Sequence, residues 1–130
     1  MPASLKVDVK NRTVYSSFEG LISDSDLLAH GSAIKNHPDF NPRFSEIVDF
    51  SKVTELRVTV GFINSLAKSG SVYSAASKHA VIAPHDLSFG IARMYQILAE
   101  DTRPTLAVVR SMDEARKFVG IPSEVETSDQ

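Results

Sequence analysis

Residues 44–68 read FSEIVDFSKVTELRVTVGFINSLAK, and this stretch decides the fold. The short, nearly continuous apolar run at 46–51 is typical of a strand buried on both faces, as in a parallel sheet. Residues 51–57 are expected to form a loop. A helix is predicted from Val58 or Thr59, because apolar residues then recur at helical spacing, at Phe62, Ile63, Leu66 and Ala67. The stretch is therefore a strand, a loop and a helix.

On the N-terminal side, the sequence predicts a hairpin and then a helix. Apolar and polar residues alternate over 5–10, and β-branched and aromatic residues follow over 13–18, closed by Glu19-Gly20. The break between the two strands is only Asn11-Arg12. Ser23 with an acid three residues later is a capping signature for the helix, which is expected to end at His37-Pro38.

On the C-terminal side, two further strand and helix units are expected. Gly70 is predicted to end the preceding helix in the left-handed conformation, and residues 71–77 fit either a helix extension or a loop. Strands are predicted at 78–83 and 105–109. Asp86 is expected to cap the third helix, and the S-x-x-E box from Ser111 begins the fourth, which Gly120 ends.

The resulting order is β-β-α-β-α-β-α-β-α. It predicts an α/β domain with a mixed five-stranded sheet, about four helices and right-handed crossovers. We expect one domain over residues 1–121. The acidic tail at 122–130 is expected to be disordered.

Composition excludes several classes of protein. The 130 residues carry a net charge of −2, which gives no basic field for nucleic acid. There is no cysteine for a disulfide or a thiolate. No apolar run approaches the roughly 20 residues that span a bilayer, and the N-terminus lacks the pattern of a signal peptide. These features predict a soluble cytoplasmic protein.

The sequence contains none of the motifs that carry common catalytic chemistry. The four histidines lack close metal-ligand spacing, so no metal is expected. Neither a G-x-S-x-G elbow nor a glycine-rich phosphate loop is present, and no cofactor is expected. We therefore expect a protein that is not an enzyme.

Two groups of residues are candidates for binding. Asp49, with Ser51, follows an apolar strand, where its carboxylate either faces a ligand or accepts backbone N–H bonds from the next loop. In the third predicted helix, Gly90 suggests the close approach of another backbone. Phe89, Arg93 and Gln96 share a face there, which is either a homodimer interface or an ordinary solvated edge.

The N-terminal hairpin, the Asp49-Phe50-Ser51 strand end and the closing V-V-R-S-M-D-E-A stretch at 108–115 resemble the STAS and SpoIIAA-like families. The resemblance implies a non-enzymatic module that binds a partner protein in bacterial-type signalling. In anti-anti-sigma factors of this type, a D-S-S-G segment carries a phosphorylated serine at a helix start. Residues 57–60 occupy that place here, and Thr59 keeps the hydroxyl, beside Arg57. Thr59 is thus a candidate regulatory residue or a simple N-cap.

The same resemblance implies a second class of function. The SpoIIAA-like group is similar to lipid-binding folds of the SEC14 type, so a carrier of a small apolar ligand or lipid is the alternative. A carrier needs a cavity, whereas an interaction module is expected to be solidly packed there. The residues expected to line such a cavity are Phe62, Ile63, Leu66, Phe89 and Tyr95.

Overall fold

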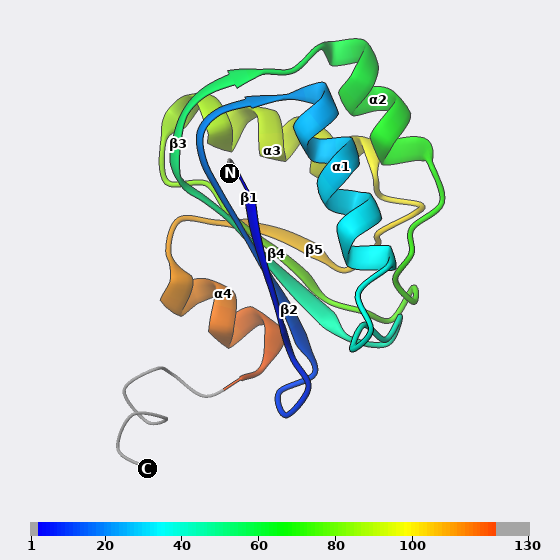
Figure 1. Cartoon of the computed structure of the whole chain (residues 1–130). Coiled ribbons are helices and arrows are strands. Elements are labelled where there is room, and N and C mark those ends of the chain that lie inside the picture. The colour runs from blue at the N-terminus through cyan, green and yellow to red at the C-terminus, as the bar shows by residue number, and fades with distance from the viewer. Residues whose placement is uncertain (1–2, 122–130) are drawn as a thin grey trace.

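Five strands form one mixed sheet in the order in which they occur along the chain (Figure 1). The computed structural model describes residues 3–121. β1 is antiparallel to β2, and the pairs β2–β3, β3–β4 and β4–β5 are parallel. The predicted element order and fold class are confirmed. The elements are β1 (Ala3–Asp8), β2 (Thr13–Ser23), α1 (Asp24–Lys35), β3 (Ser45–Arg57), α2 (Val60–Lys68), β4 (His79–Ile82), α3 (Asp86–Leu98), β5 (Leu106–Val109) and α4 (Met112–Val119).

The strand order determines how the helices are distributed. When each parallel strand lies next to the one before it, right-handed crossovers place all connecting helices on one face. α1, α2 and α3 accordingly lie on one face of the sheet, and α4, which follows the last strand, lies on the other (Figure 1). The α4 face is closed by Ile47, Ala80 and Ile82 packed against Ala115.

The central parallel pair is much longer than expected. β3 continues through residues 51–57, which the sequence predicts as a loop, and β2 continues past Gly20 to Ser23. The two extensions pair with each other, from Glu19↔Lys52 to Ser23↔Arg57. The loop prediction was wrong because each extension supplies the backbone partners that the other needs. We call this two-stranded part the ribbon, and it arches over the helices in Figure 1.

A left-handed glycine helps the ribbon to depart from the plane of the sheet. Gly20 has φ 75°, and the pairing register of β2 and β3 shifts next to it, between Gly20 and Leu21. A bulge of this kind bends a strand and increases its local twist. Gly120 has φ 82° at the C-terminus of α4, as predicted. Gly70 does not end α2, because the helix stops at Ser69 in an extended conformation.

The turns and caps also depart from the sequence prediction at two places. The β1–β2 connection spans residues 9–12 rather than two residues, and the Asp8 carboxylate accepts hydrogen bonds from the backbone and side chain of Asn11. At α3 the N-cap is His85, without a side-chain cap, and Asp86 is already helical. The capping box of Ser23 forms as predicted, whereas Ser111 caps α4 only through its side chain, which accepts a hydrogen bond from the Glu114 backbone N–H.

Residues 71–77 are neither strand nor helix, which settles the alternative left open for them. They lead from α2 to β4, and Tyr73 within them is buried against Val14, Ile34 and Phe44. The predicted tail at 122–130 lies outside the described residues. Within residues 3–121, no helix is long and apolar enough to cross a membrane.

Candidate functional site

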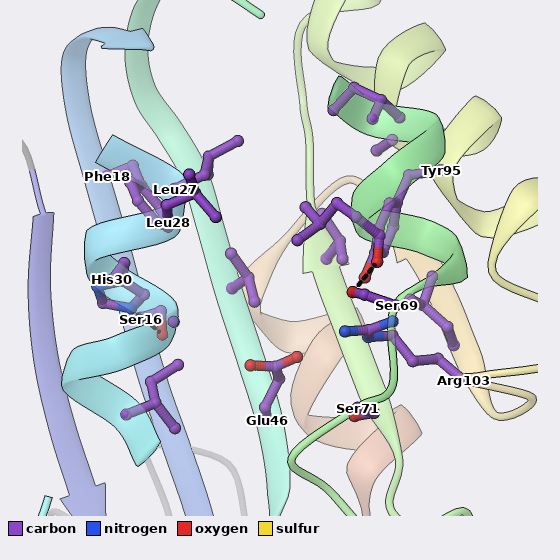
Figure 2. Close-up of a pocket in the computed structure, with 18 of the residues that line it drawn as sticks. Ser16, Phe18, Leu27, Leu28, His30, Glu46, Ser69, Ser71, Tyr95 and Arg103 are labelled. Atoms are coloured by element: carbon purple, nitrogen blue, oxygen red, sulfur yellow. Dashed lines mark hydrogen bonds between the residues drawn. The ribbon is translucent and has the colours of Figure 1, made fainter. Parts of the chain in front are cut away.

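A cavity of about 370 Å³ separates α1 from α2 and α3 on the three-helix face of the sheet (Figure 2). This volume lies within the range of natural small-molecule pockets, roughly 300–1,000 Å³. Side chains of β2, β3, β4 and β5 form its floor, and the three helices form its walls. Its apolar lining includes Phe18, Leu27, Leu28, Val48, Phe50, Ile63, Leu66, Val81 and Ile91.

The cavity exists because α1 packs incompletely. Only His30 and Ile34 of this helix are buried, while Leu28 borders the cavity and is 58% exposed. The two strands of the ribbon lead into the N-termini of α1 and α2, which therefore lie side by side. There, the Asp24 carboxylate accepts hydrogen bonds from the Thr59 backbone N–H and hydroxyl. The helices are thus joined at one end and separated by the cavity along their length.

A buried polar cluster lies at the β3 side of the cavity. Glu46 Oε1 accepts a hydrogen bond of 2.8 Å from His79 Nδ1, and Glu46 Oε2 accepts one of 3.0 Å from the Tyr73 hydroxyl. The His79 side chain is 1% exposed and that of Glu46 is 14% exposed. The ring of Tyr73 packs edge-on against that of His79, with 4.9 Å between centroids.

This cluster holds Glu46 as a carboxylate. Burial alone would raise the pKa of Glu46, but the hydrogen bond and charge of His79, the Tyr73 hydroxyl and the charge of Arg103 bring it below its ordinary value. Burial and the neighbouring carboxylate raise the pKa of Tyr73, so its hydroxyl stays protonated as a donor. Each carboxylate oxygen of Glu46 therefore already has one donor.

Across the cavity, two side chains within residues 3–121 have hydrogen-bond donors that are not all used. Arg103 and Tyr95 both line the cavity, Arg103 pointing toward Glu46 and Tyr95 toward Ser69 (Figure 2). Within residues 3–121, the only side-chain hydrogen bond of Arg103 is from Nη1 to Thr102 Oγ1, and it forms no ion pair. The Tyr95 hydroxyl makes no hydrogen bond within the same residues. Burial raises the pKa of Tyr95 to about 12, so this hydroxyl keeps its proton.

A third polar pair lies at the α1 wall. His30 Nε2 lies 2.6 Å from Ser16 Oγ, and the ring of His30 packs edge-on against Phe18. Burial lowers the pKa of His30, although the charge of Glu46 acts in the opposite direction. His30 is therefore mainly neutral near pH 7. This hydrogen bond pairs His30 Nε2 with Ser16 Oγ, and both residues line the cavity.

Only some of the residues predicted to line a cavity do so in the structure. Ile63, Leu66 and Tyr95 line it, whereas Phe62 and Phe89 are not among its lining residues. Phe89 packs instead in the cluster formed by Val81, Ala83, Ala92 and Leu106.

Thr59 lies at the N-cap of α2, and its hydroxyl accepts a hydrogen bond from Phe62 N. Arg57 does not contact it, because Arg57 pairs with Glu55. The carboxylate beside Thr59 is that of Asp24. A phosphate on Thr59 would therefore be placed against a negative charge.

Replacing Thr59 by alanine is expected to lower the free energy of unfolding by about 1 kcal/mol, because α2 loses its capping oxygen. Thr59→Ser keeps that oxygen and should remain close to the natural protein. Urea unfolding monitored by circular dichroism measures both variants. If Thr59→Ser costs as much as Thr59→Ala, the loss does not come from the cap.

Asp49 and Ser51 do not lie at the end of a strand, because β3 continues to Arg57. Asp49 Oδ1 accepts a hydrogen bond of 2.8 Å from the backbone N–H of Ser51. That is the kind of local backbone bond expected for a structural role. Neither residue lines the cavity.

The candidate interface on α3 is partly engaged within the molecule. Gln96 Nε2 donates to the Leu106 carbonyl and Gln96 Oε1 accepts from Arg93. The guanidinium of Arg110 stacks on the ring of Phe89 at 3.9 Å from its centroid. No atom from another part of residues 3–121 lies within 4 Å of the place where a Cβ of Gly90 would stand, so the expected close approach of another backbone is wrong.

Sequence reasoning missed most of the polar residues of the cavity. Glu46 and His79 are aligned by the parallel register of β3 and β4, and Arg103 reaches the site from the loop before β5. A usable signal was present at Glu46 and His79, since each is a titratable residue near the start of a strand and is followed directly by apolar residues. Arg103 carries no such signal.

No known protein family matches the chain, and no curated protein is similar enough to count as a relative. Within the described residues, no group of three or more histidine, aspartate or glutamate side chains is placed to hold a metal ion. Homodimer formation and a cytoplasmic location stay predictions.

Proposed function

We propose that this protein is a non-enzymatic binding protein whose cavity takes a small apolar molecule. The observation that carries the proposal is the 370 Å³ cavity, lined mainly by apolar side chains, at a place where a pure interaction module would be packed. Exposed Leu28 and Gly70 border it, which gives a ligand access from solvent. A limited number of polar side chains, among them Glu46, Tyr95 and Arg103, also line it, as in sites that orient a ligand.

The proposal is tested with a neutral apolar fluorophore, N-phenyl-1-naphthylamine. The natural protein is expected to enhance its fluorescence with saturation at one molecule per chain. Leu66→Trp, in which the indole enters the cavity from α2, should abolish the enhancement. Val60→Trp places the same side chain on the same helix, at a residue that is 69% exposed and does not line the cavity.

The control variant should bind the fluorophore as the natural protein does. Loss of binding in both tryptophan variants, or in neither, would contradict binding in this cavity. Circular dichroism and thermal unfolding establish that each variant is folded before its binding is compared.

We further propose that the chain is of the STAS/SpoIIAA-like type. The hairpin followed by three strand and helix units supports this assignment. A second function, binding of a partner protein at the start of α2, is favoured by Val60, a large apolar side chain that is 69% exposed directly after Thr59. The fluorophore experiment separates the two functions, because partner binding at that surface requires no open cavity.

A further inference from the structure

At the polar end of the cavity, the positive guanidinium of Arg103 lies near the Tyr95 ring, whose hydroxyl is a second hydrogen-bond donor. These donors favour an apolar ligand that carries a negatively charged head group. We infer that the cavity binds a carboxylate with an apolar body, its head held by Arg103 and Tyr95 and its body among the apolar side chains. This inference rests on the proposed function and adds the chemical class of the ligand. The observation that supports the inference is that the hydrogen-bond donors of Arg103 and Tyr95 are not all used.

The donors at this end exceed the acceptors that the protein offers them. Arg103 has one side-chain hydrogen bond, to Thr102, and the Tyr95 hydroxyl has none within residues 3–121. Ser69 donates its hydroxyl to the Leu66 carbonyl, which leaves only its oxygen as an acceptor. A ligand that satisfies Arg103 and Tyr95 must bring acceptor oxygens. A carboxylate supplies two, in the geometry that a guanidinium pairs with best.

Glu46 does not take the place of that ligand. Its two oxygens are held by His79 and Tyr73, and it forms no ion pair with Arg103 within 4.0 Å. The charge of Arg103 contributes to lowering the pKa of Glu46, but it acts from beyond ion-pair distance. The guanidinium of Arg103, which is partly buried 5.6 Å from the centre of the Tyr95 ring, remains available to a ligand.

The size of the cavity limits the ligand. A volume of 370 Å³ equals that of about 12 water molecules in the liquid. A methylene group takes up about as much space as a water molecule, so an acid of decanoate size fills the cavity. The apolar body then lies against Phe18, Phe50 and Leu66, away from the arginine.

The test compares decanoate with decanol, which share a chain and differ in the head. Both are titrated as competitors of the neutral fluorophore at pH 7.5, below the concentration at which decanoate forms micelles. Decanol is the more hydrophobic of the two, so a preference for decanoate cannot arise from apolar burial. We expect the natural protein to bind decanoate at least about tenfold more tightly than decanol.

Arg103→Gln should weaken decanoate binding by about tenfold and leave decanol binding unchanged. Tyr95→Phe should weaken decanoate by a smaller factor, because it removes the hydroxyl and keeps the ring. Arg93→Gln is the matched control, since Arg93 is exposed, lies outside the cavity and carries the same charge. It should bind both compounds as the natural protein does.

Each result has a distinct meaning. Equal binding of decanoate and decanol by the natural protein, or equal weakening by Arg103→Gln and Arg93→Gln, would overturn the carboxylate inference and leave the apolar site standing. Failure of the neutral fluorophore itself to bind would overturn the proposed function. Tyr95→Phe gives a second measure that does not change the net charge, and its failure to affect decanoate would remove Tyr95 from the inference.

Discussion

Replacing Glu46 by glutamine is expected to lower the free energy of unfolding by about 2–3 kcal/mol at pH 7. Both oxygens of this buried carboxylate accept hydrogen bonds, from His79 and Tyr73, and hydrogen bonds to charged groups are each worth more than neutral ones. A glutamine amide presents one acceptor and one NH₂ group. One of the two donors would then meet another donor.

The effect of Glu46→Gln should depend on pH in a defined direction. The pKa of Glu46 lies below 4.5, its ordinary value, in the folded protein, so the folded state binds fewer protons there than the unfolded state. The stability supplied by the carboxylate is present above 4.5 and is lost as pH falls through the folded pKa. Glu46→Gln has no carboxylate at this position and so does not lose stability in this way. The unfolding free energies of the natural protein and of Glu46→Gln should therefore converge at acid pH.

Urea unfolding at pH 7 and at several values below 4.5 measures this convergence. Glu55→Gln is the matched control, because Glu55 lies on the same strand with its side chain half exposed and paired with Arg57. Its effect should stay within about 0.5 kcal/mol. A constant difference between natural and Glu46→Gln proteins across this range would contradict a lowered pKa of Glu46 in the folded state.

Replacing Ile47 by alanine is expected to cost about 4 kcal/mol of unfolding free energy. Ile47 is fully buried on the α4 face, packed with Ala80, Ile82 and Ala115. Truncation there leaves a closed void in a packed cluster, and its cost rises with the volume of that void. No neighbouring strand or helix can move in without disturbing the sheet.

Ile63→Ala is the matched comparison and should cost only about 2 kcal/mol. Ile63 is 4% exposed, yet it borders the existing cavity, so its truncation enlarges a space that is already there. Thermal and urea unfolding measure both variants. Equal costs would indicate that Ile63 is as closely surrounded as Ile47, which would contradict an open cavity at that position.

The fold could be predicted from the sequence because local signals agreed with the global pattern. The N-caps at Ser23 and Ser111, the proline after His37 and the left-handed Gly120 each act through nearby backbone groups. The ribbon could not be predicted in this way. Residues 51–57 become a strand only because β2 lies beside them, and pairing between distant segments leaves little trace in local composition.

The site was less predictable than the fold. Ile63, Leu66 and Tyr95 were expected at the cavity because helical periodicity places them on the inward face. Glu46, His79 and Arg103 come from three separate segments, and only the register of β3 with β4 and the loop before β5 bring them together. Spacing along the chain cannot encode such a meeting. That a carboxylate lies opposite a histidine on the neighbouring strand is determined by the tertiary structure.

The sequential strand order has a consequence for the growing chain. Of the four helices in residues 3–121, α4 alone covers the second face of the sheet, and it follows all five strands of that part of the chain. During synthesis from the N-terminus, Ile47, Ala80 and Ile82 are therefore made long before the helix that shields them. Until Ala115 and its neighbours leave the ribosome, a nascent sheet would present an apolar side to solvent and to other chains, the kind of surface on which chaperones act.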